Sequence, residues 1–130
     1  MIILTLHPFN KTIWPRKKPV RLNSSKGLDF RNWHFMFDVI TAIPTKEIPE
    51  NVVVVHDVFG DKHESTTSAL SGERLRYASA AKVASVLDYS LRKWEGDKSG
   101  EEKKTFKLFD KMYRKINRLP GRTPVILDWH

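Results

Sequence analysis

The strongest constraint on the fold is an amphipathic pattern that runs from residue 99 to residue 119. Ser99 and Glu102 have the spacing of a capping box, in which a hydroxyl and a carboxylate satisfy free backbone N–H groups at a helix start. Pro120 and Gly121 are a typical stop signal. A helix of this kind needs a second layer to cover its apolar face. The apolar positions are Phe106, Phe109, Met112, Tyr113, Ile116 and Leu119.

The sequence predicts another helix over residues 71 to 94. Ser71 is the expected N-cap, with Glu73 in the first turn, where a negative charge is favourable. Gly96 is the expected stop signal. Small residues beside the apolar stripe predict that this helix packs closely on a sheet. The stripe consists of Leu75, Ala80, Val83, Leu87, Leu91 and Trp94.

Four segments have the composition or alternation of strands: residues 2–6, 33–43, 51–56 and 124–129. The second and third of these are expected to pair as an antiparallel hairpin. We therefore predict an α+β fold with a small, mostly antiparallel sheet of about four strands. The element order is β-β-β-α-α-β, and the two helices cover one face of the sheet.

The length of 130 residues predicts one domain over residues 1–130, because two separate cores would each be too small to be stable. A basic, proline-containing loop is expected at residues 10–31. The absence of cysteine excludes a disulfide scaffold and any cysteine-containing zinc site. No run of eighteen apolar residues occurs, and the opening segment is too short for a secretory signal. We expect a cytoplasmic protein that does not bind membranes.

The net charge of +8 is unevenly distributed along the chain. Residues 1–31 contain seven Lys and Arg against one acid, residues 32–73 contain two against seven, and residues 74–130 contain fourteen against seven. Two basic ends therefore flank an acidic middle segment. This separation of charge favours a polyanionic partner over a uniformly solvated surface.

The helix predicted over residues 99–119 carries a cationic stripe opposite its apolar face. Like charges four residues apart repel by about 0.2–0.5 kcal/mol per pair, so an external polyanion or the acidic middle segment must offset them. We favour the external partner because Arg122 and the N-terminal loop extend the same sign. The stripe consists of Lys103, Lys104, Lys107, Lys111, Arg114, Lys115 and Arg118.

The N-terminal loop places Trp14 among basic side chains in a proline-stiffened backbone. An exposed aromatic ring can stack on an unpaired base while Lys and Arg contact phosphates. Burial of Trp14 in the core is the competing interpretation. The candidate nucleic-acid-binding residues of this segment are Trp14, Arg16, Lys17, Lys18 and Arg21.

Residues 56–65 concentrate side chains that can ligate a metal. His56, Asp57, Asp61 and His63 are the candidate ligands, with Glu64 as a further carboxylate. The sequence predicts that a strand ends near His56 and that a turn follows, so a distant ligand is needed to complete a site. The candidates for that ligand are His34, Asp38 and His130. An ordinary turn with solvent-facing His and Glu is the alternative.

Three functions remain open. The favoured one is a non-catalytic nucleic-acid-binding or accessory protein that uses the basic helix and loop and needs no cofactor. The second is a metal-dependent nuclease or phosphodiesterase centred on residues 56–64, which requires a divalent metal. The third is a protein-interaction module, such as an inhibitor or adaptor, that docks on an acidic partner. No nucleophile elbow or phosphate-binding glycine loop is present, so a binding protein is favoured over an enzyme.

Overall fold

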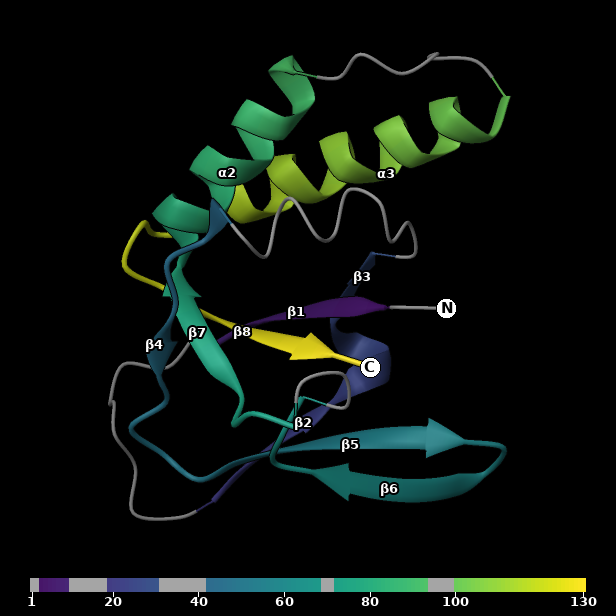
Figure 1. Cartoon of the computed structure of the whole chain (residues 1–130), viewed down its shortest axis with the longest axis vertical. Coiled ribbons are helices and arrows are strands. Elements are labelled where there is room, and N and C mark those ends of the chain that lie inside the picture. Colours follow the sequence, from purple (N-terminus) through teal and green to yellow (C-terminus); the bar gives the residue numbers. More distant parts are fainter. Residues whose placement is uncertain (1–2, 10–18, 31–41, 69–71, 94–99) are drawn as a thin grey trace.

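The computed structural model describes residues 3–9, 19–30, 42–68, 72–93 and 100–130. Within these residues the chain forms an α+β fold, as predicted, with two helices packed on a mostly antiparallel sheet (Figure 1). No described helix is both long and apolar enough to cross a bilayer.

A five-stranded antiparallel sheet forms the middle layer, with strand order β3-β1-β8-β7-β4. Its centre is the pairing of β1 with β8, in which Leu6 lies opposite Leu127 and Thr5 lies opposite Asp128. The strands are β1 (Leu4–Pro8), β3 (Leu28–Phe30), β4 (Lys46–Glu47), β7 (Arg76–Ser79) and β8 (Pro124–Trp129).

Helices α2 (Ala80–Arg92) and α3 (Gly100–Asn117) cover one face of this sheet (Figure 1). Alternate residues of β1 and β8 point into the helix layer, so Leu6 and Leu127 lie in the same core as Phe109 and Ile116 of α3. The apolar face predicted for the helix at residues 99–119, now α3, is confirmed for Phe109, Met112 and Ile116, which are buried.

A three-stranded sheet covers the opposite face of the middle layer. It contains β2 (Val20–Asn23), β5 (Val52–Val58) and β6 (Asp61–Ser65), with β2 parallel to β5 and β6 antiparallel to it. Ile126 of β8 and Val54 of β5 share a second core between the two sheets. The side chains of β1 and β8 that do not face the helices therefore face β5.

The turn between β5 and β6 places Phe59 and Gly60 at φ angles of 51° and 86°. Positive φ at both central residues is the signature of a type I′ turn. Asp57 accepts a hydrogen bond from the Gly60 N–H at 3.0 Å, which closes the turn. Phe59 is fully exposed, so no burial offsets the strain of its left-handed backbone.

The structure corrects the start of the helix predicted over residues 71–94. Residues 76–79, which the helical pattern included, form β7 because they hydrogen-bond to β8 and β4. The N-cap is Ser79, whose hydroxyl accepts from the N–H of Lys82 at 3.3 Å, rather than Ser71. Both Ser71 and Trp94 lie outside the described residues.

Most of the predicted strand at 33–43 also lies outside the described residues, and Ile43 is buried in the helix-side core. The structure adds strands that the sequence did not predict. Those strands are β2, β3, β4, β6 and β7.

Candidate metal centre and cationic helix

Three side chains from two sheets converge between the layers: His56 of β5, Asp128 of β8 and His130, which follows β8. Each offers one ligand-type atom, and these atoms all lie within 4.8 Å of one another. The rings of His56 and His130 have centroids 4.5 Å apart. The arrangement depends on the packing of β5 over β8, because neither strand alone supplies all three side chains.

Asp128 is the most deeply placed member of the group, with only 1% of its side chain exposed. Neither of its carboxylate oxygens has a hydrogen-bond partner. Its Oδ2 atom lies 3.4 Å from Nε2 of His56, 3.8 Å from Nε2 of His130 and 3.9 Å from Nε2 of His7. A carboxylate is thus surrounded by imidazole rings that approach without donating to it.

A row of residues across the sheet orients His130. Thr5 lies opposite Asp29 on one side and Asp128 on the other, and its hydroxyl donates to Asp29 Oδ1 at 2.7 Å. The hydroxyl oxygen of Thr5 also lies 2.8 Å from Nε2 of His130. Because the single hydroxyl proton is engaged by Asp29, His130 must donate its Nε2–H to Thr5. In a neutral ring that donates through Nε2, the other nitrogen, Nδ1, keeps its lone pair.

Burial lowers the pKa of His56 below its usual value, since desolvation penalises the charged ring. The nearby Asp128 raises this pKa, while His130, His7 and His63 lower it. The net direction is downward, so the fold favours the neutral imidazole, which is the form that binds metals.

The structure separates the other ligands predicted on the β5–β6 hairpin. His63 lies opposite His56 and is exposed, and Asp61, at the start of β6, is also exposed. Asp57 has its side chain engaged in the turn, and Glu64 forms an ion pair with Arg21. Of these hairpin residues, only His56 joins the group at Asp128.

His130 was among the distant ligands proposed from the sequence, whereas His34 and Asp38 lie outside the described residues. Sequence reasoning missed Asp128, His7 and the Thr5–Asp29 pair. One signal was available for Asp128, which is an acid within the otherwise apolar strand Pro124–Trp129. Strand alternation places it on the face opposite Leu127, but the sequence does not show what covers that face.

The cationic stripe lies on the outer side of α3, where Lys103, Lys107, Lys111 and Lys115 are exposed. Arg114 pairs with Asp110 within the helix at 3.2 Å. Among the described residues, no acid of the middle segment pairs with these four lysines or with Arg118. The middle segment therefore does not neutralise this part of the stripe in the described structure.

The middle segment instead pairs with basic residues elsewhere. Glu64 pairs with Arg21 of β2, and Glu47 pairs with Arg74 at 3.6 Å. Arg122 is exposed in the turn before β8. The candidate residues Trp14, Arg16, Lys17 and Lys18 lie outside the described residues, so their assignment stays a prediction.

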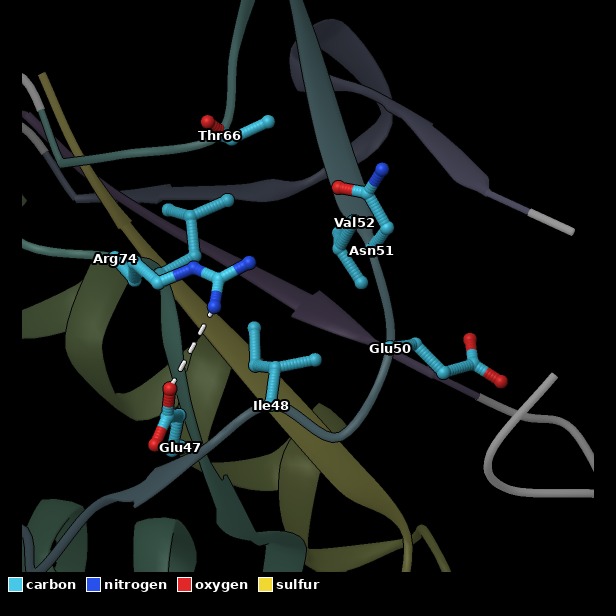
Figure 2. Close-up of a pocket in the computed structure, with 8 residues that line it drawn as sticks. Glu47, Ile48, Glu50, Asn51, Val52, Thr66 and Arg74 are labelled. Atoms are coloured by element: carbon cyan, nitrogen blue, oxygen red, sulfur yellow. Dashed lines mark ion pairs between the residues drawn. The ribbon is translucent and has the colours of Figure 1, made fainter. Parts of the chain in front are cut away.

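A small pocket lies beside the start of β5 (Figure 2). The Arg74–Glu47 ion pair crosses one side of it, and Glu50 points away from that pair. The space inside is about that of a single water molecule. Its lining includes none of the residues at Asp128, so we do not assign the function to this pocket.

Comparison of the chain with protein-family models, with curated proteins and with solved structures found no match.

Proposed function

We propose that this protein binds nucleic acid through the outer face of α3. The observation that carries the proposal is the row of exposed lysines at positions 103, 107, 111 and 115, none of which pairs with an acid of the middle segment within the described chain. Phosphate oxygens supply the missing negative charge without requiring a particular base sequence.

The spacing of the lysines suits a polyanion with regular charges. Residues four apart on a helix rise by about 6 Å, and the stripe from Lys103 to Arg118 extends for about 22 Å. The lysine row contains three like-charged pairs at this spacing, which together cost roughly 0.6–1.5 kcal/mol in the free protein. Binding to phosphates relieves this repulsion, so the free energy lost within the helix is recovered in the complex.

The helix face and the His56–Asp128–His130 group lie on opposite sides of the five-stranded sheet (Figure 1). A phosphate backbone held on α3 therefore does not reach the group at Asp128 along the same face. This separation supports a non-catalytic binding role for the helix. This arrangement does not favour a nuclease that holds its substrate on α3 and cleaves it at residues 56–64.

The test is the salt dependence of binding, measured by fluorescence anisotropy with labelled duplex DNA, single-stranded DNA and RNA. If about five phosphates are contacted, the affinity for duplex falls with log salt at a slope near −4.5, and for a single strand at a slope near −3.5. Absence of binding to all three probes at low salt contradicts the proposal.

The matched variants compare charge at two places. Lys107, Lys111 and Lys115 are changed to Gln in one protein, and the exposed Lys46, Lys62 and Lys82 are changed to Gln in the other. Both triple variants lose three positive charges, but only the first loses them from α3. We expect the first variant to bind at least tenfold more weakly than the second. Equal losses in the two variants contradict binding through α3.

An acidic protein is the competing partner, because it also responds to salt and to charge neutralisation. A pull-down from lysate treated with nuclease distinguishes the two. Loss of the captured material after treatment supports nucleic acid, whereas retention of a protein on the wild type but not on the α3 triple variant contradicts it.

A further inference from the structure

The carboxylate of Asp128 lacks a partner that its burial requires. It is almost completely buried, and neither oxygen accepts a hydrogen bond. A buried carboxylate without hydrogen bonds or a counter-charge is strongly unfavourable. The missing partner is a hydrogen-bond donor or a positive charge, and a bound cation supplies the latter.

The distances favour a shared cation over protonated histidines. The nitrogens of His56, His130 and His7 lie 3.4–3.9 Å from Asp128 Oδ2, beyond the range of about 2.7–3.2 Å for a donated N–H bond. Two ligand atoms on one tetrahedral zinc ion lie about 3.3 Å apart, because each bond is about 2.0–2.1 Å long. The separation of 3.4 Å between His56 and Asp128 matches this value.

We propose that His56, Asp128 and His130 bind a divalent transition-metal ion of the zinc class. Two imidazole nitrogens and one carboxylate oxygen are a common set of protein ligands for such an ion. Three protein ligands leave a fourth position for water or another small ligand. His56 and His130 are 14% and 26% exposed, so the ion has a route from solvent.

The surroundings of the ligands are already arranged for this role. The Asp29–Thr5–His130 chain holds Nε2 of His130 2.8 Å from the Thr5 hydroxyl oxygen, so Nδ1 is the ring nitrogen that Thr5 does not engage. Carboxylate-anchored partners of this kind orient metal-ligating histidines in many sites. His7 is buried beside Asp128, with its Nε2 atom unpaired and 3.9 Å from Oδ2.

Gly27 lies against Thr5 and His7, two neighbours of the proposed ligands. A Cβ atom at this position would lie 2.2 Å from Cγ2 of Thr5 and 2.8 Å from Cε1 of His7. Both contacts are shorter than real Cβ atoms make, so only glycine allows the backbone after β2 to lie against these two side chains.

The experiment is a calorimetric titration of the full chain with ZnCl₂ after treatment with EDTA and dialysis, without nucleic acid present. We expect one ion per chain with a dissociation constant below about 1 μM, and a Co²⁺ complex whose visible spectrum is that of a tetrahedral site. Failure of either ion to bind overturns the proposal. Because no nucleic acid is used, this result is independent of binding by α3.

The variants His56→Ala and His130→Ala should each weaken zinc binding at least 100-fold. Circular dichroism establishes that each variant is folded, and the partly exposed His130 is the position least expected to disturb folding. The control is His63→Ala, which removes an exposed histidine from the same hairpin and should change the affinity less than twofold. Unchanged binding in the first two variants, or an equal loss in the control, contradicts the assigned ligands.

Discussion

Nε2 of His56 lies 3.4 Å from Oδ2 of Asp128, although the two residues belong to strands of different sheets. This contact joins the layers two residues beyond Val54 and Ile126, which share the apolar core between the two sheets. Polar groups at such a position reduce stability unless they are fully paired. The free energy of unfolding should therefore depend on the charges of His56 and Asp128.

The first prediction concerns Asp128→Asn. In the metal-free protein this change replaces a buried carboxylate that has no hydrogen-bond partner with a neutral amide of the same shape, so we expect the free energy of unfolding to rise by about 1–3 kcal/mol. In wild-type protein, free zinc at 100 times its dissociation constant should add about 2.7 kcal/mol, and the variant should lose this gain. Urea denaturation with EDTA and with zinc measures both effects. A variant that zinc stabilises as much as wild type would contradict the assignment.

The second prediction is a pH dependence of stability. The fold lowers the pKa of His56, so between the lowered value and about 6.5 the unfolded chain binds more protons than the folded one. The contribution of the neutral His56 ring to the free energy of unfolding is therefore complete above about pH 6.5, and it is lost as the pH falls.

The measurement compares wild type with His56→Gln in urea and EDTA from about pH 8 to about pH 5.5. The groups that face His56 are Asp128, His130, His7 and His63, and both proteins retain them. We expect the stability of wild type relative to the variant to decrease toward low pH, and an increase would contradict the direction of the shift.

The third prediction concerns Gly27→Ala. The added methyl group must displace Thr5 and His7, and overpacking of this kind costs about 1–3 kcal/mol. The displacement also disturbs the orientation of His130, so zinc should bind about 10- to 100-fold more weakly. Lys26→Ala, at the exposed neighbouring position, is the control and should change stability by less than about 0.5 kcal/mol. Similar effects of the two changes would argue against the close approach of Gly27.

The fourth prediction concerns Phe59→Asn in the β5–β6 turn. Asn followed by Gly is the preferred pair for a type I′ turn, and Phe59 buries no surface that the change would expose. We expect a gain of about 1 kcal/mol, because a left-handed backbone disfavours Phe by about 1–2 kcal/mol. A thermal melt should show a midpoint several degrees higher. A lower midpoint would indicate that the Phe59 ring makes a stabilising contact.

Local patterns in the sequence predicted the α+β class, the strands near residues 51–56 and 124–129, and the apolar face of α3. The first helix was predicted too long because Arg76–Ser79 fits a helical pattern as well as a strand. Pairing with β8 on one side and β4 on the other decides between them. That pairing is a long-range contact, which no local window contains.

The candidate metal site shows the same limit. His56 and His130 could be named from residue type and strand ends, but Asp128 required knowledge of which face of β8 is covered. The three-stranded sheet that covers it includes the unusual parallel pairing of β2 with β5, which the sequence does not indicate. The sequence therefore supplied two of the three proposed ligands, and the packing of the sheets supplied the third.

The most direct test of the proposed function is to map the nucleic-acid contact by NMR, using ¹⁵N-labelled protein titrated with a short oligonucleotide at low salt. We expect the largest shifts of backbone signals at Lys107, Lys111, Lys115 and their neighbours on α3, with small shifts around His56 on the opposite face of the sheet. Shifts centred on the β5–β6 hairpin, or no shifts at saturating oligonucleotide, would contradict binding through α3.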